Sequence, residues 1–135
     1  MKLPKIEEMK EILEPLKEKY EAILFGSAVE GGMRPESDID IAIITRNKNE
    51  KQNIELQKSL LGEFPLKFDI RVFELFPIDI QISIIKNYKV IFSNPLEISE
   101  YFYYFRKKWD DCKYRILSNQ FTSYHERLFI IKQIS

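Results

Sequence analysis

The stretch "LFGSAVEGGMRPESDIDIAII", residues 24–44, decides the fold, because it joins a glycine-rich loop to two aspartates that open an apolar run. Residues 22–25 are apolar and end at a glycine, so we expect a short buried strand there. Residues 39–45 have the character of a second strand. Side chains alternate along a strand, so Asp38 and Asp40 share one of its faces and the isoleucines share the other.

The aspartate pair makes chemical sense if cations bind beside it. Two positions on a strand are roughly 6.6 Å apart, and carboxylates at that separation can flank two metal ions about 3.5–4 Å apart. Without a cation, Asp38 and Asp40 would repel each other. The segment "LKFDIRVFE" predicts a third strand over residues 66–73, and its Asp69 joins the pair if the two strands are neighbours. Ligands that are all oxygen favour Mg²⁺ or Mn²⁺.

A binding site for phosphate groups is predicted at the end of the first strand. Gly26 and Ser27 open a turn or a short helix, where backbone N–H groups attract anions and the serine hydroxyl adds a donor. Gly26 also lets the chain approach a phosphate closely. Arg34, Lys67 or Arg71 could contact the remaining phosphate charge.

These residues together resemble a known family. A Gly-Ser pair, ten intervening residues, an Asp-x-Asp motif and a later aspartate are similar to the nucleotidyltransferase fold of the DNA polymerase β superfamily. The resemblance covers roughly residues 5–93. The loop resembles the minimal nucleotidyltransferases, which are often encoded beside a helical HEPN-domain protein. It does so through Gly31, Arg34, Pro35 and Ser37.

The resemblance implies an activity and a set of roles. It implies transfer of a nucleoside monophosphate from a nucleoside triphosphate, with ATP as the expected donor, to a hydroxyl acceptor. Asp38 and Asp40 would hold two Mg²⁺ ions, and Asp69 would bind the catalytic metal and help to activate the hydroxyl. The nucleotide-binding residues would be Gly26, Ser27, Arg34 and Arg71. Similar proteins act as antitoxins of HEPN toxins, and some adenylylate a toxin tyrosine.

One residue departs from the resemblance and keeps alternatives open. Many similar proteins carry arginine where this chain has Glu30. One alternative is therefore a protein with the same fold that neutralises its partner by binding alone, and another is an enzyme that modifies a small molecule or an RNA end. Asp38 and Asp40 could instead belong to a solvated turn, and Arg34 and Arg71 could be surface charges that pair with the aspartates.

Composition limits the other classes of function. The chain has 135 residues, enough for one domain, and its 21 basic and 21 acidic residues give no general field for nucleic acid. One cysteine and one histidine exclude an internal disulfide framework and any metal site rich in either residue. We find no apolar run of transmembrane length. The first 20 residues are charged, unlike a signal peptide, so we expect a soluble cytoplasmic protein with no membrane contact.

The remaining pattern predicts an α/β (α+β) fold with a small mixed sheet and flanking helices. We expect a single domain overall, in which a nucleotidyltransferase core over residues 1–94 carries a helical extension over 95–135. Besides the three strands, we expect helices over residues 5–20, 48–62 and 78–85, a strand over 89–93, and a helix that begins after Asn94 and runs to about residue 117. Ser123 and Glu126 resemble a capping box that opens a last helix.

The extension also carries an aromatic stripe with helical spacing. We predict that its first four positions form at least partly an intermolecular surface, for a second copy of the chain or for a HEPN partner. The alternative is that the stripe packs on the chain's own sheet. The stripe consists of Ile98, Phe102, Phe105, Trp109, Cys112 and Ile116.

Overall fold

The computed structural model describes residues 6–26, 29 and 38–134, and for residues 116–134 it describes the backbone alone. No helix within these residues is both long and apolar enough to cross a membrane. The elements in chain order are α1 (Ile6–Ile12), α2 (Glu14–Lys17), β1 (Glu21–Phe25), β2 (Ile39–Ile44), α4 (Glu50–Leu60), β3 (Phe68–Val72), the 3₁₀ turn η1 (Phe73–Leu75), α5 (Ile78–Lys86), β4 (Lys89–Phe92) and α6 (Pro95–Ile134).

The four strands form one mixed sheet in the order β3-β2-β1-β4. β1 runs antiparallel to both of its neighbours, whereas β2 and β3 run parallel and are joined by α4. The end of β1 therefore lies beside the starts of β2 and β3, at one end of the strands. We use the word edge for either of these two ends of the sheet. The predicted fold class is confirmed.

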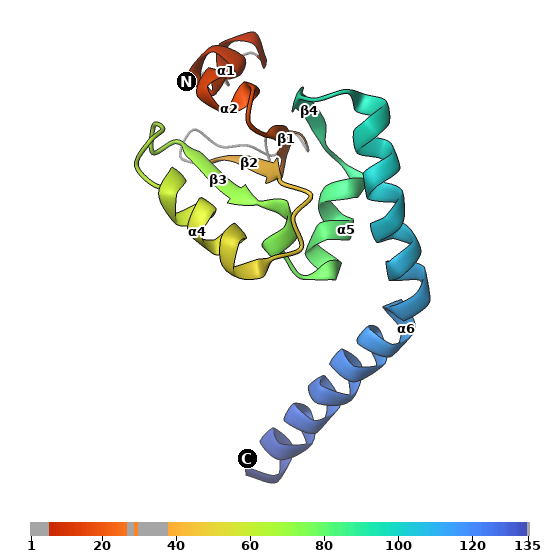
Figure 1. The fold of residues 1–135 in the computed structure, drawn as a ribbon. Coiled ribbons are helices and arrows are strands. Elements are labelled where there is room, and N and C mark those ends of the chain that lie inside the picture. The colour runs from red at the N-terminus through yellow and green to blue at the C-terminus, as the bar shows by residue number, and fades with distance from the viewer. Residues whose placement is uncertain (1–5, 27–28, 30–37, 135) are drawn as a thin grey trace.

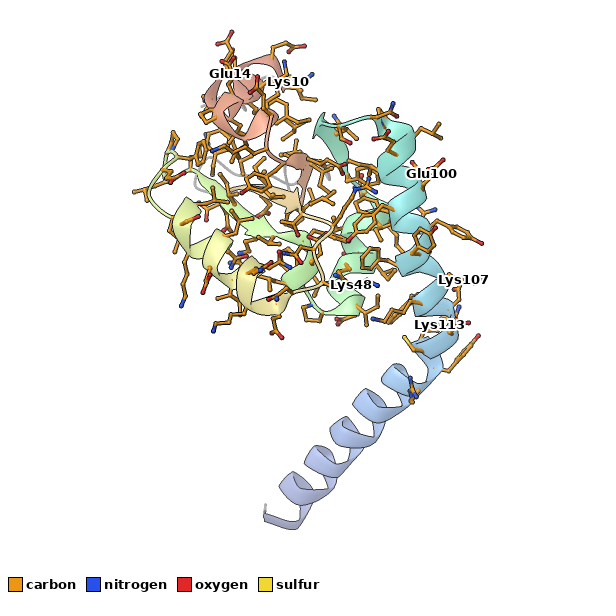
Figure 2. All side chains as sticks on the ribbon, in the orientation of Figure 1. Lys10, Glu14, Lys48, Glu100, Lys107 and Lys113 are labelled. Carbon is orange, nitrogen blue, oxygen red and sulfur yellow. The ribbon has the colours of Figure 1, made fainter. Side chains whose placement is uncertain are left out.

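Helices cover both faces of this sheet (Figure 1). On one face, Ile39, Ile41 and Ile43 of β2 pack in a buried cluster with residues of α1, α2 and α4, as the alternation predicts. On the other face, Ala42 and Ile44 pack with residues of α5 and the first turns of α6. Side chains fill both interfaces in Figure 2, where Lys10 and Glu14 mark the first helices and Lys107 and Lys113 mark α6. Both faces are hydrophobic cores, so polar chemistry is confined to the edges.

The ends of the helices follow local chemistry. The amide N–H of Gln52 donates to Asn49 Oδ1 at 3.0 Å and caps α4, and Leu96 N–H donates to Asn94 Oδ1 at 2.9 Å at the start of α6. The predicted helix over 5–20 divides into α1 and α2 at Leu13, because Pro15 cannot continue the backbone hydrogen bonds of the helix before it. The third strand is shorter than predicted, since Phe73 begins η1.

A hydrogen-bond network around Glu74 stabilises the edge of the sheet that is remote from the aspartates. Its carboxylate accepts hydrogen bonds from the backbone N–H groups of Thr45 and Arg46, at 3.1 and 2.9 Å, and from the Tyr101 hydroxyl at 2.7 Å. Burial and this hydrogen bond raise the pKa of the Tyr101 hydroxyl far above its ordinary value. The Arg46 guanidinium lies 4.7 Å from the centre of the Tyr101 ring. Glu74 thereby links β2, η1 and α6.

α6 is one uninterrupted helix from Pro95 to Ile134, and the predicted separate helix from Ser123 is wrong. A Ser-x-x-Glu sequence caps a helix only where the preceding backbone leaves the helix, and here the backbone continues through it. The first half of α6 packs along α5, whereas the second half projects away from the rest of the molecule (Figure 1).

The aromatic stripe is part of the chain's own core at its beginning. Ile98 and Phe102 have exposed fractions of 0% and 1%, and the Phe102 ring stacks at 5.0 Å from that of Phe73. Phe105 and Trp109 are half-buried against the same cluster. The prediction of an intermolecular surface is therefore wrong for Ile98 and Phe102, because one face of the sheet needs them as its cover.

Candidate active site

Three strands bring a glycine and two carboxylates into one row at one edge of the sheet. Phe25, the last residue of β1, pairs with Asp40 of β2, and Asp40 pairs with Asp69 of β3. The row therefore crosses the sheet in the order β1, β2, β3. Asp38 directly precedes β2 at the same edge and is exposed. The expectation that Asp69 lies beside the first pair depended on the strand order, which this structure supplies.

Gly26 closes this row against the Asp40 carboxylate. It has φ of +76°, in the left-handed region that glycine tolerates best. A Cβ atom placed on it would overlap Asp40 Oδ2 and lie 3.2 Å from Asp40 Cγ. Only a glycine leaves room there, so the backbone after β1 stands directly against the acidic site.

The negative charges of the carboxylates repel one another. The pKa of the half-buried Asp40 is raised by burial first, and then by the negative charges of Asp69 and Asp38, while the Arg71 guanidinium lowers it. Arg71 Nε also lies 3.2 Å from Asp69 Oδ1, and both side chains point from the exposed face of β3. Among the described residues that shift the pKa of Asp40, the Arg71 guanidinium carries one positive charge against the carboxylates of Asp38 and Asp69, so the site favours additional positive charge.

The donor set fits a hard divalent cation, because carboxylate oxygens are the ligands such ions prefer. Within the described residues, no three acidic, histidine or cysteine side chains converge on one point as they stand. The backbone register still places Asp40 beside Asp69, with Asp38 two residues before Asp40. The side chains of Asp38 and Asp69 would have to turn inward around an ion.

The structure describes some of the residues predicted to contact phosphate and not others. Outside the described residues lie Ser27 and Arg34, together with Glu30, the residue that departs from the resemblance. Lys67 precedes β3, where its carbonyl accepts a hydrogen bond of 2.7 Å from Ile39 N–H and so ties the loop to the start of β2. Arg71 is at the site, in contact with Asp69.

A cavity of about 290 Å³ opens beside the row on the β3 side. Asp38, Asp69 and Arg71 line it together with residues of the loop that connects α4 to β3, including Leu61 and Leu66. The sequence pattern had not predicted this loop as part of the site. The sequence "LLGEFPL", residues 60–66, does indicate an apolar loop, because apolar residues flank a glycine and a proline in a segment too short for another helix or strand.

Comparison with known proteins supports the same fold and chemistry. The family model of polymerase β nucleotidyltransferases matches residues 7–97. A protein of Methanocaldococcus jannaschii with the name "Putative protein adenylyltransferase" is 40% identical over 113 residues, which is 84% of this chain and 88% of that protein.

Two solved structures share the fold. A chain in the crystal structure of a toxin–antitoxin with AMP-PNP matches with a TM-score of 0.57 and 16% identity, over 84% of this chain and 96% of its own length. A chain of a mutant toxin–antitoxin MntA–HpeT matches with a TM-score of 0.57 and 14% identity over the same shares.

Proposed function

Because this chain belongs to the polymerase β nucleotidyltransferase family, we propose that it transfers AMP from ATP to a tyrosine hydroxyl of a partner HEPN-domain protein, as an antitoxin. Membership of the family makes the chain a nucleotidyltransferase. The donor, the acceptor and the site residues are the proposal. The observation that carries it is the row formed by Gly26, Asp40 and Asp69 across three neighbouring strands.

Each member of the row has a distinct task. In the proposal the triphosphate approaches the backbone after β1, because Gly26 stands directly against the Asp40 carboxylate, beside which a cation that neutralises phosphate charge would bind. Ser27, Arg34 and Arg71 add donors to the phosphates in the proposal. Asp38, Asp40 and Asp69 would hold two Mg²⁺ ions, for which Mn²⁺ could substitute. Such ions would supply positive charge that offsets the phosphate charge developing during transfer.

The transfer itself is an in-line displacement. The acceptor oxygen attacks the α-phosphorus of ATP and forms a new O–P bond. The bond from that phosphorus to the oxygen bridging to the β-phosphate breaks, and pyrophosphate leaves with the electron pair. The hydroxyl proton passes to the Asp69 carboxylate. The protein's contribution is to align the reactants and to stabilise charge.

A protein acceptor is supported by the comparisons. The relative with the name "Putative protein adenylyltransferase" matches over 88% of its own length, and both similar solved chains come from toxin–antitoxin structures. We also propose that residues 1–94 form the catalytic core and residues 95–135 an extension, whose projecting second half is free to meet a partner chain.

The experiment is transfer of label from α-³²P-ATP to a HEPN-domain protein taken from the same organism as this chain. We expect labelling with MgCl₂ or MnCl₂ and none with EDTA. Asp38→Asn, Asp40→Asn and Asp69→Asn should each reduce the rate by roughly 10²–10³-fold. The matched control is Asp111→Asn on the exposed surface of α6, which should keep full activity. Binding of the partner without any metal-dependent ATP turnover would instead support a non-enzymatic antitoxin.

A further inference from the structure

The loop between α4 and β3 exposes two large apolar side chains next to the acidic row. Leu61 is 73% exposed and Leu66 is 95% exposed. Single exposed leucines are ordinary on a protein surface, but two of them lining one cavity with carboxylates are a candidate contact surface. We call residues 61–66 the leucine loop.

Backbone hydrogen bonds at both ends and one packed side chain in the middle tie the leucine loop to the rest of the chain. Gly62 has φ of +83° and turns the chain directly after α4, where Leu61 N–H donates to the Lys58 carbonyl at 3.2 Å. At the other end, Phe68 N–H donates to the Pro65 carbonyl at 2.9 Å. Phe64 packs against the buried cluster and anchors the middle of the loop. The two leucines are thus presented outward although the chain has a core in which such residues are stabilised.

The leucine loop lies on the acceptor side of the row. In-line displacement requires the attacking oxygen and the leaving pyrophosphate to stand on opposite sides of the phosphorus. If the leaving phosphates lie over Gly26 at the end of β1, the attacking hydroxyl comes from the direction of β3. Asp69 and the leucine loop stand on that side, and both line the same cavity.

We propose that the leucine loop is the docking surface for the acceptor, and that it contacts apolar side chains that flank the acceptor hydroxyl in a protein segment. This inference rests on the proposed transfer reaction and specifies its substrate. A small hydroxyl compound needs only the acids and the nucleotide, and an RNA end would be met by cations rather than by leucines. An apolar pair beside the reacting group selects a peptide with apolar neighbours, because burial of those side chains stabilises the complex.

The test is the double variant Leu61→Ser, Leu66→Ser. Both side chains are exposed, so the variant should fold with an unchanged melting temperature. We expect kcat/KM for the HEPN-domain protein to fall at least tenfold, mainly through KM. Transfer to N-acetyl-tyrosinamide, a small acceptor without flanking residues, and the Kd of ATP should stay within twofold of wild type. The matched control is Leu96→Ser, 67% exposed, where β4 leads into α6 at the opposite edge of the sheet.

Three results would overturn the docking proposal. The double variant could lose activity equally toward the protein and the small acceptor. Its affinity for ATP could fall, which would make the loop part of the nucleotide site. It could also modify the HEPN protein at the wild-type rate. If the wild-type chain transfers nothing to any acceptor, the proposed function fails by itself. The docking proposal is then decided by calorimetry with the HEPN protein: an equal Kd for wild type and double variant rejects it, and a Kd at least tenfold higher in the variant supports it.

Discussion

Gly26 and Asp40 are in contact across two strands so closely that a methyl group on Gly26 would occupy the place of a carboxylate oxygen. We predict that Gly26→Ala loses stability for two separable reasons. The left-handed backbone costs an alanine roughly 1–2 kcal/mol, and the contact with Asp40 adds a steric penalty.

A double-mutant cycle separates the two causes. In an Asp40→Ala background, Gly26→Ala should cost only the backbone term, because the overlapping atoms are gone. Urea denaturation of the four proteins measures both terms. Equal costs of Gly26→Ala in the two backgrounds would contradict the contact.

Asp40 is expected to weaken the fold in metal-free buffer. Burial and its acidic neighbours raise its pKa above the ordinary 3.8, so the folded state binds its proton more tightly than the unfolded state. The stability this proton provides is present below pH 3.8 and is lost as the pH rises through the raised pKa. Asp40→Asn should therefore unfold at a higher temperature than wild type at pH 7, in EDTA.

The same measurement has an internal check. The advantage of Asp40→Asn should shrink as the pH falls through the raised pKa of Asp40 toward 3.8, because the wild-type carboxyl group is then increasingly neutral as well. Asp111→Asn, on the exposed surface of α6, is the matched control. An Asp40→Asn protein less stable than wild type at pH 7 would mean that the carboxylate serves the fold.

Phe102 and Tyr104 test the division of α6 into core and surface. Phe102 is 1% exposed and Tyr104 is 69% exposed, although they are two residues apart. Phe102→Ala should lower the free energy of unfolding by roughly 3–5 kcal/mol, and Phe102→Glu should prevent folding. Tyr104→Ala should change it by at most about 0.5 kcal/mol. A folded Phe102→Glu protein would restore the interface interpretation that the packing rejects.

Glu74 should stabilise the fold strongly for a half-buried side chain. Its carboxylate accepts from Thr45, Arg46 and Tyr101, and hydrogen bonds to a charged acceptor are each worth about 1.5–3 kcal/mol. Because the bonds share one group and are not additive, we expect Glu74→Ala to cost roughly 2–4 kcal/mol in chemical denaturation. Glu100→Ala, on α6, is the exposed control, and a similar small change in both variants would refute the network.

The sequence predicted the strands and the acidic edge because both depend on short-range rules. Alternation assigns Asp40 to one face of β2, and a glycine after an apolar run marks the end of β1. The pairing of Asp40 with Asp69 could not be predicted, because register depends on how α4 and the loop after it return the chain to the sheet. The burial of Phe102 was predicted wrongly for a similar reason, since helical spacing identifies a stripe without identifying what covers it.

The orientation of α4 has an electrostatic consequence. α4 carries the chain from the far end of β2 back to the start of β3, so the helix ends at Leu60, which lines the same cavity as Asp38 and Asp69. The carboxyl end of a helix carries a partial negative charge of roughly half an electron. It reinforces the carboxylates, so the potential at this edge repels bare polyphosphates at a distance and draws in cations. A triphosphate that arrives already complexed with a divalent ion carries less negative charge and is therefore favoured over a free one. Because salt screens the remaining repulsion, the association rate of ATP should rise with ionic strength.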